Sequence, residues 1–171
     1  MKLPELPSLN RPEVRALSSR SQFFPYELTG NHREVVLGFR YNPPCKENQN
    51  RASFRARVKI TDSDNTNAVG RTYILNFKVG RTGESQDYSD RDRLGFVAAC
   101  VGQKQDDPDF DADAAQQTLV DLDDTGGFDS EECQIFHTRT SKVKEKATKK
   151  NGQAVLEEVV YANDYFAPIS S

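Results

Sequence analysis

Residues 51–63, RASFRARVKITDS, alternate apolar and cationic side chains with a period of two. The apolar positions are Phe54, Ala56, Val58 and Ile60. The cationic positions between them are Arg55, Arg57 and Lys59. Because successive side chains of a β-strand point to opposite faces, this pattern predicts a strand with one buried face and one cationic face. An ordinary solvated strand face remains the alternative interpretation of the three cations.

Two further strands are predicted on either side of this one. HREVVLGFRY, residues 32–41, has apolar side chains at period two, and so does RTYILNFKVG, residues 71–80. The positions taken to share one face are Val35, Leu37, Phe39 and Tyr41 in the first, and Tyr73, Leu75, Phe77 and Val79 in the second. The turn residues of 63–70, SDNTNAVG, predict that the second and third strands form a hairpin.

The later part of the chain predicts two helices and then a long hairpin. A helical insert over about residues 89–125 begins with Ser89 as N-cap, and Gly102 closes its first helix. Asp residues suit the start of the second helix. Asn151-Gly152 is a strong two-residue hairpin signal, so a basic β-hairpin is expected over about residues 133–163.

The composition describes one folded body with polar extensions. The chain has 171 residues, is 36% hydrophobic and holds ten Phe and six Tyr, which suffice for one core. Residues 1–27 contain four prolines and predict an extended N-terminal arm. The folded domain is expected over residues 28–166, and residues 167–171 form a C-terminal tail.

The net charge of −3 conceals an uneven distribution. Residues 51–81 hold seven Lys and Arg against two Asp, and residues 137–150 hold six against one Glu. Residues 105–132 hold eleven Asp and Glu and no Lys or Arg. The acidic segment is most simply a solvated helix, although it could also repel nucleic acid or recruit a basic partner.

Several classes of protein find no support in the sequence. No apolar run approaches the ~20 residues that span a bilayer, and the N-terminus lacks a signal-peptide core, so we expect a cytoplasmic protein without a membrane partner. Cys45, Cys100 and Cys133 follow no disulfide or zinc spacing. No nucleophile, base or metal arrangement emerges around His32 or His137, so we expect no enzyme activity, no metal and no cofactor. An unrecognised enzyme site is the least favoured alternative.

Three strands, a helical insert and two more strands follow the order of an OB-type barrel, although small α+β sheets share it. The predicted fold is therefore mainly β with a helical insert (α+β): an OB-like five-stranded barrel with an extended arm and a long C-terminal β-hairpin. In that architecture the basic segments flank the ligand-binding face. The candidate phosphate contacts are Arg55, Arg57, Lys59, Lys78, Arg139, Lys142, Lys144, Lys149 and Lys150. The candidate stacking rings are Phe136 and Tyr161, with Tyr73 and Phe77 favoured as core residues.

Four short pieces resemble the pattern of bacteriophage single-stranded DNA-binding proteins of the OB-fold kind. They are LTGNH at 28–32, VKITDS at 58–63, the Val69-Gly70 turn and FVAACVG at 96–102. The resemblance implies non-enzymatic, sequence-tolerant binding of single-stranded DNA in phage replication or recombination, with a homo-oligomer or a replication protein as a further partner. The chain departs from many such proteins because its acidic block is internal and its C-terminus, NDYFAPISS, is not an acidic tail.

A different class of function competes with this one. A phage structural or assembly module would hold neighbouring proteins through the N-terminal arm, the acidic insert and the basic hairpin. The two hypotheses differ in where the charged segments must lie in space. A nucleic-acid binder needs the cations of residues 55–59 and of the hairpin on one face.

Overall fold

The computed structural model describes residues 8–15, 28–42, 46, 52–78, 84–129, 131 and 133–169. The helices are α1 (Pro12–Arg15), α2 (Glu84–Cys100) and α3 (Ala112–Asp124). The strands are β1 (Gly30–Asn42), β2 (Ser53–Ser63), β3 (Thr72–Lys78), β4 (Gln134–Lys150) and β5 (Gln153–Pro168). The protein is mainly β with a few helices, and the predicted order of elements is confirmed.

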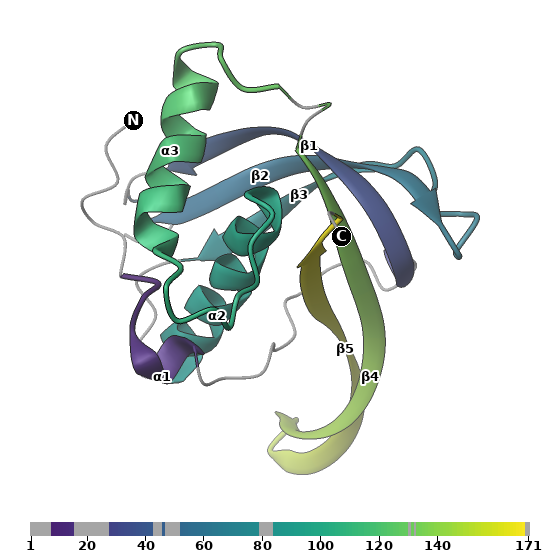
Figure 1. Cartoon of the computed structure of the whole chain (residues 1–171). Coiled ribbons are helices and arrows are strands. Elements are labelled where there is room, and N and C mark those ends of the chain that lie inside the picture. Colours follow the sequence, from purple (N-terminus) through teal and green to yellow (C-terminus); the bar gives the residue numbers. More distant parts are fainter. Residues whose placement is uncertain are drawn as a thin grey trace.

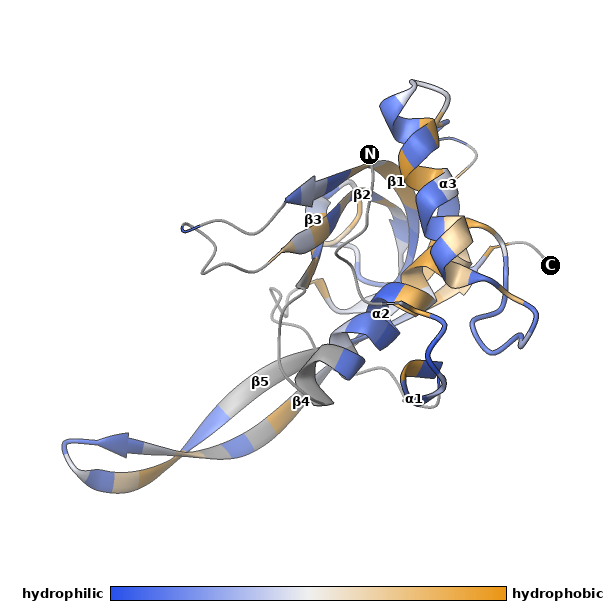
Figure 2. Ribbon diagram, turned by 90° about the vertical axis from the view of Figure 1, so that its left-hand side faces the viewer, coloured by the Kyte–Doolittle hydropathy of each residue, from blue (hydrophilic) through white to orange (hydrophobic). Residues whose placement is uncertain are grey.

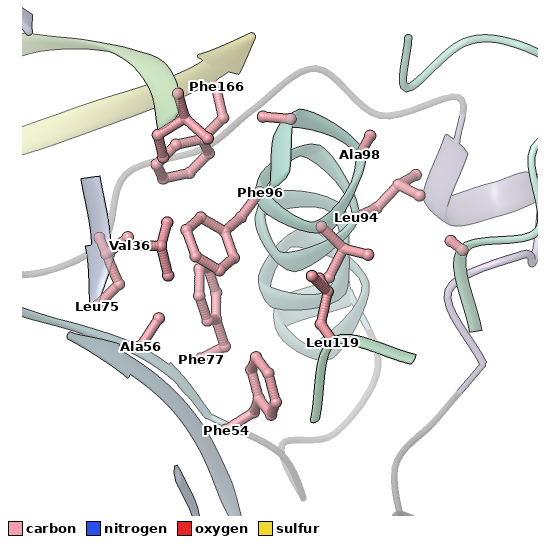
Figure 3. Close-up of a cluster of buried hydrophobic side chains, with 14 of the residues drawn as sticks. Val36, Phe54, Ala56, Leu75, Phe77, Leu94, Phe96, Ala98, Leu119 and Phe166 are labelled. Carbon is pink, nitrogen blue, oxygen red and sulfur yellow. The ribbon is translucent and has the colours of Figure 1, made fainter. Parts of the chain in front are cut away.

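The five strands form one antiparallel sheet in the order β3-β2-β1-β4-β5, which curves around α2 (Figure 1). The expectation of a closed barrel is wrong, because the sheet stays open between β3 and β5 in the described part of the chain. Helix α2 contacts both of these edge strands. Its Phe96 ring lies 5.4 Å from Phe77 of β3 and 5.5 Å from Phe166 of β5 (Figure 3). The helix therefore fills the space that closure would need.

Strand β2 has the predicted alternation, but the buried face of β1 differs from the prediction. Val36 is fully buried and Phe39 nearly so, whereas Val35 and Leu37 are only half-buried. A register shift between Val36 and Gly38 leaves Leu37 as an extra residue opposite β2. Such a bulge moves the following side chains to the other face. A strict period of two therefore assigned Val35 and Leu37 to the core and missed Val36, whereas its assignment of Phe39 is confirmed.

The core lies between the concave face of the sheet and the helices α2 and α3 (Figure 3). Residues 89–99 of α2 are all buried. Ser89 is not an N-cap, because α2 begins five residues earlier at Glu84. Gly102 does close α2: its φ is +72°, and Gln103 N–H donates to the carbonyl of Ala98.

The described part of the predicted arm, residues 8–15, packs on the chain's own helices. Leu9 and Val14 are fully buried. The backbone N–H of Leu9 donates to Asp113 of α3 at 2.9 Å, and Arg11 pairs with Asp87 of α2 at 3.1 Å. These residues are therefore part of the folded body. Residues 1–7 and 16–27 of the predicted arm lie outside the described residues.

Strands β4 and β5 form the predicted hairpin and pair without interruption from Ile135–Pro168 to Lys150–Gln153. Asn151 and Gly152 have φ angles of +51° and +78°, as a type I′ turn requires. Strand β1 pairs with β4 only as far as Arg139. Residues 140–163, which we call the ribbon, extend away from the helices as two twisted strands (Figure 2).

Candidate nucleic-acid interface

The cations of β2 lie on the convex side of the sheet. Arg57 and Lys59 are exposed and Arg55 is half-buried, while the apolar residues between them are buried. The alternation that the sequence predicted is therefore confirmed. The Nε atom of Arg55 is buried and has no hydrogen-bond partner.

The strand register extends this convex surface from β2 to β1, β4 and β5, because directly opposed residues share a face. Arg55 lies opposite Arg40, and Phe136 lies opposite Arg33. Tyr165 lies opposite Thr138, two residues along β4 from Phe136. We define the outer face by seven side chains: Arg33, Arg40, Arg55, Arg57, Lys59, Phe136 and Tyr165. It also holds one acid, Asp62, opposite Arg33.

The cations of the outer face have no ion-pair partner in the part of the chain that the structure describes. Among the described residues, no ion pair involves Arg33, Arg40, Arg55, Arg57 or Lys59. Arg40 and Arg55 are directly opposed, and like charges in that position destabilise a sheet. An anion bound between Arg40 and Arg55 would reduce the repulsion of these two like charges.

Two exposed aromatic rings lie on the outer face, and one of them, Phe136, is beside Arg33. Phe136 is 40% exposed, and the guanidinium of Arg33 lies 5.3 Å from its ring centroid. Tyr165 is 50% exposed and is a diagonal neighbour of Phe136 on the next strand. Phe77 is buried in the core, as favoured. Tyr73 is partly buried and packs against the core cluster. Sequence reasoning missed Tyr165. It lies directly between the buried Asp164 and Phe166, so the alternation of this strand could have revealed that it faces outward.

The hairpin cations divide between two faces. Counting by two along β4 from Phe136 reaches Lys150, which is exposed and pairs with Glu157. Lys149 is also exposed but belongs to the opposite face of the ribbon. The side chains of Lys78, Lys142, Lys144 and Tyr161 lie outside what the structure describes. Their backbones are placed, and Lys142 pairs with Tyr161 in the register.

Arg139 does not belong to the exposed cations. It is 1% exposed, and its Nε donates to Asp164 Oδ1 at 2.7 Å. Its guanidinium also lies 5.4 Å from the ring centroid of Tyr73. The alternation in QIFHTRT explains this position, because Arg139 shares the inward face of Ile135 and His137. The expectation that it tracks a phosphate backbone is therefore corrected.

Arg139 is part of a buried polar cluster on the concave face, together with Glu34, Tyr73, His137 and Asp164. His137 is 2.6 Å from Glu34 through Nδ1 and 2.5 Å from Asp164 through Nε2. Tyr73 Oη lies 2.6 Å from the same Nδ1 and donates to Glu34. Sequence reasoning did not find this cluster, because its members come from four strands.

The protonation of His137 follows from its two carboxylate neighbours. Burial by itself would lower the pKa of His137, but the charges and hydrogen bonds of Glu34 and Asp164 outweigh it and raise the pKa to about 9. Burial would raise the pKa of Asp164, yet His137 and Arg139 hold it below its usual value. The raised pKa of His137 and the lowered pKa of Asp164 both favour the charged ion pair between these two residues.

The cluster joins strands rather than presenting a surface to solvent. Glu34 and His137 are inaccessible, and Asp164 is 2% exposed. The ion pairs and hydrogen bonds of the cluster link β1, β3, β4 and β5. The arrangement is suited to holding the curvature of the sheet, and so to positioning the outer face on the other side.

Three further observations on the described residues concern metal ligands, free thiols and membrane spans. They contain no group of three or more His, Cys, Asp or Glu arranged to hold a metal ion. Cys100 and Cys133 are free thiols. No helix in the described part of the chain is long and apolar enough to cross a membrane.

No family model, no curated protein and no solved structure matches this chain.

Proposed function

We propose that this protein is a non-enzymatic binder of single-stranded nucleic acid, with single-stranded DNA as its ligand. One observation carries the proposal: the outer face combines five cations that lack ion-pair partners among the described residues with two exposed rings. The resemblance to phage proteins extends the proposal to phage DNA replication or recombination.

The chemistry of the outer face matches a flexible strand better than a duplex. Its cations can replace the counterions of phosphates, which is the sequence-independent source of affinity. Phe136 and Tyr165 can stack on bases, whose faces are accessible only when the strand is single. A phosphate between Arg40 and Arg55 would also remove the repulsion between these opposed guanidinium groups.

The strand order supports an OB-like relationship. The order β3-β2-β1-β4-β5 is the neighbour order of a five-stranded Greek-key barrel that has been opened between its third and fifth strands. Oligonucleotides bind OB-folds on the strand face flanked by the loops between strands 1 and 2 and between strands 4 and 5. Here the β4–β5 connection is the ribbon, which continues the same sheet.

The test is binding to fluorescently labelled oligo-dT of about 20 nucleotides, which exceeds the site size of one OB-type domain. Fluorescence anisotropy should show binding at low salt, weaker binding to a duplex of equal length, and an affinity that falls steeply with added salt. Absence of oligo-dT binding at low salt would contradict the proposal.

A matched pair of charge reversals locates the interface. Lys59→Glu changes the outer face, whereas Lys104→Glu changes an exposed lysine between α2 and α3 by the same charge. Lys59→Glu should weaken oligo-dT binding by about tenfold or more at low salt, and Lys104→Glu should change it little. Equal effects would mean that net charge, not the outer face, governs binding.

A further inference from the structure

The ribbon is a two-stranded hairpin with exposed apolar side chains. Two-stranded hairpins are marginally stable alone in water. Beyond Arg139, β4 has no partner among the described residues except β5. The ribbon nevertheless exposes large apolar side chains: Val143 is 57% exposed and Leu156 is 69% exposed. Such a ribbon is suited to packing against another surface.

The register assigns these apolar side chains to one face. Counting inward from the turn, the cross-strand pairs on that face are Lys149–Ala154, Ala147–Leu156, Glu145–Glu158 and Val143–Val160. We call it the ribbon docking face, and its described side chains are exposed. Val155 is also exposed, at 39%, but lies on the opposite face because it pairs with Thr148.

The docking face contains an electrostatic conflict. Glu145 and Glu158 are directly opposed, so their Cβ atoms are about 4.5–5.5 Å apart and their carboxylates repel. On the opposite face of the ribbon, Glu157 is instead paired with Lys150. Among the described side chains, no cation pairs with Glu145 or Glu158, and a partner that supplies one would stabilise the docking face.

A second copy of the chain supplies that cation by symmetry. The Glu145–Glu158 pair and the Lys149–Ala154 pair lie two residues on either side of the Ala147–Leu156 pair. At about 3.4 Å per residue, both are about 7 Å from it. A two-fold axis through the Ala147–Leu156 pair would place each acidic pair against Lys149 of the other copy.

We propose that two copies of this protein associate through the ribbon docking face, with Leu156 packed on Leu156 of the second copy and Lys149 between Glu145 and Glu158 across the axis. The contact is isologous, so it closes into a dimer. A few residue pairs on each ribbon form less than a standard-size interface, so the dimer is weak and depends on concentration. The inference does not rest on nucleic-acid binding.

The first experiment compares two substitutions on adjacent residues. Sedimentation equilibrium of the full chain over about 1–200 µM, a range suited to weak association, should show a monomer–dimer equilibrium. Leu156→Glu should leave a monomer, whereas Val155→Glu, on the opposite face, should preserve the dimer. A wild-type chain that stays monomeric, or equal effects of the two substitutions, overturns the proposal and leaves the face to a different partner.

A charge exchange tests the symmetry itself. Lys149→Glu alone should abolish the dimer, and so should the double substitution Glu145→Lys/Glu158→Lys, since each sets like charges against each other. Combining all three substitutions should restore dimerisation. Failure of the combination to restore it, in a chain with unchanged circular dichroism, overturns the two-fold arrangement. Oligo-dT binding by Leu156→Glu, measured in parallel, reports on the outer face separately.

Discussion

Tyr73 Oη on β3 lies 2.6 Å from His137 Nδ1 on β4, although β2 and β1 separate these strands in the sheet. In a flat sheet three strand spacings would separate them by about 14 Å, which no tyrosine side chain spans. The contact therefore measures the curvature of the sheet. The curvature assembles the buried cluster on the concave side, while the cations of the outer face lie on the convex side.

The stability of the protein should fall at alkaline pH. His137 has an unfolded pKa of 6.5 and a folded pKa of about 9, so the folded state holds the proton more tightly. This stabilisation is complete below pH 6.5 and is lost as the pH rises to about 9, by about 3 kcal/mol in total. Urea unfolding at steps between about pH 6 and pH 10 should reveal the decline.

A comparison with His32 and a substitution of His137 assign the alkaline loss of stability to His137. Burial lowers the pKa of His32, so His32 affects stability only on the acidic side of pH 6.5. His137→Gln should be less stable at neutral pH but should lose the alkaline dependence between about pH 6.5 and 9. An unchanged alkaline slope in this variant, or a His137 imidazole that titrates near 6.5 by NMR, would refute the charged cluster.

The salt dependence of oligo-dT binding should show how many phosphates the outer face contacts. For single strands, log K falls against log salt with a slope of about −0.7 per neutralised phosphate. Replacing Arg57 and Lys59 together by Ala should make the slope shallower by about 1.4. A slope identical to that of the wild-type protein would show that these exposed residues contact no phosphate.

The exposed rings should contribute to affinity without changing the salt slope. Base stacking on an aromatic ring is worth about 1–3 kcal/mol, or roughly 5- to 150-fold in affinity. Phe136→Ala and Tyr165→Ala should each weaken oligo-dT binding within that range. Phe136→Tyr, which keeps the ring, should bind nearly as the wild-type protein does, and a loss equal to that of Phe136→Ala would argue against stacking.

The described N-terminal residues should contribute to folding stability. Leu9 is fully buried, and removing a buried leucine side chain costs about 2–5 kcal/mol. Leu9→Ala should therefore lower the urea midpoint strongly. Leu122→Ala is the matched control, because Leu122 is 41% exposed on α3 and its truncation should cost about 1 kcal/mol or less. Equal shifts for both variants would show that Leu9 is not anchored.

Local patterns sufficed for much of the fold. The alternation of residues 54–60 predicted β2 and its cationic side, and Asn151-Gly152 predicted the hairpin and its two-residue turn. Both depend on interactions a few residues apart along the chain. The bulge at Leu37 was not foreseen, because it is defined by the strand opposite and leaves only a break in the apolar period.

The residues of the candidate site also differ in whether local sequence patterns could place them. Arg57 and Lys59 were identified because their own strand shows which way they face. Arg139 was misassigned, since a charged side chain was taken to be exposed when Asp164 on β5 in fact holds it in the interior. Sequence reasoning also treated His137 as isolated, because its two carboxylate neighbours, Glu34 and Asp164, lie on other strands and are distant along the chain.

The sequence by itself determined which segments become strands and helices, where the hairpin turns, and which side of β2 is cationic, since backbone preferences and hydrophobic periodicity act locally. Tertiary structure alone decided that the sheet stays open and that four strands share one buried charged cluster. It also decided that Phe136 lies beside Arg33 of β1, with Tyr165 as its diagonal neighbour on β5. These features require distant residues to meet, and their energies depend on burial and charge that exist only after the sheet has curved around α2.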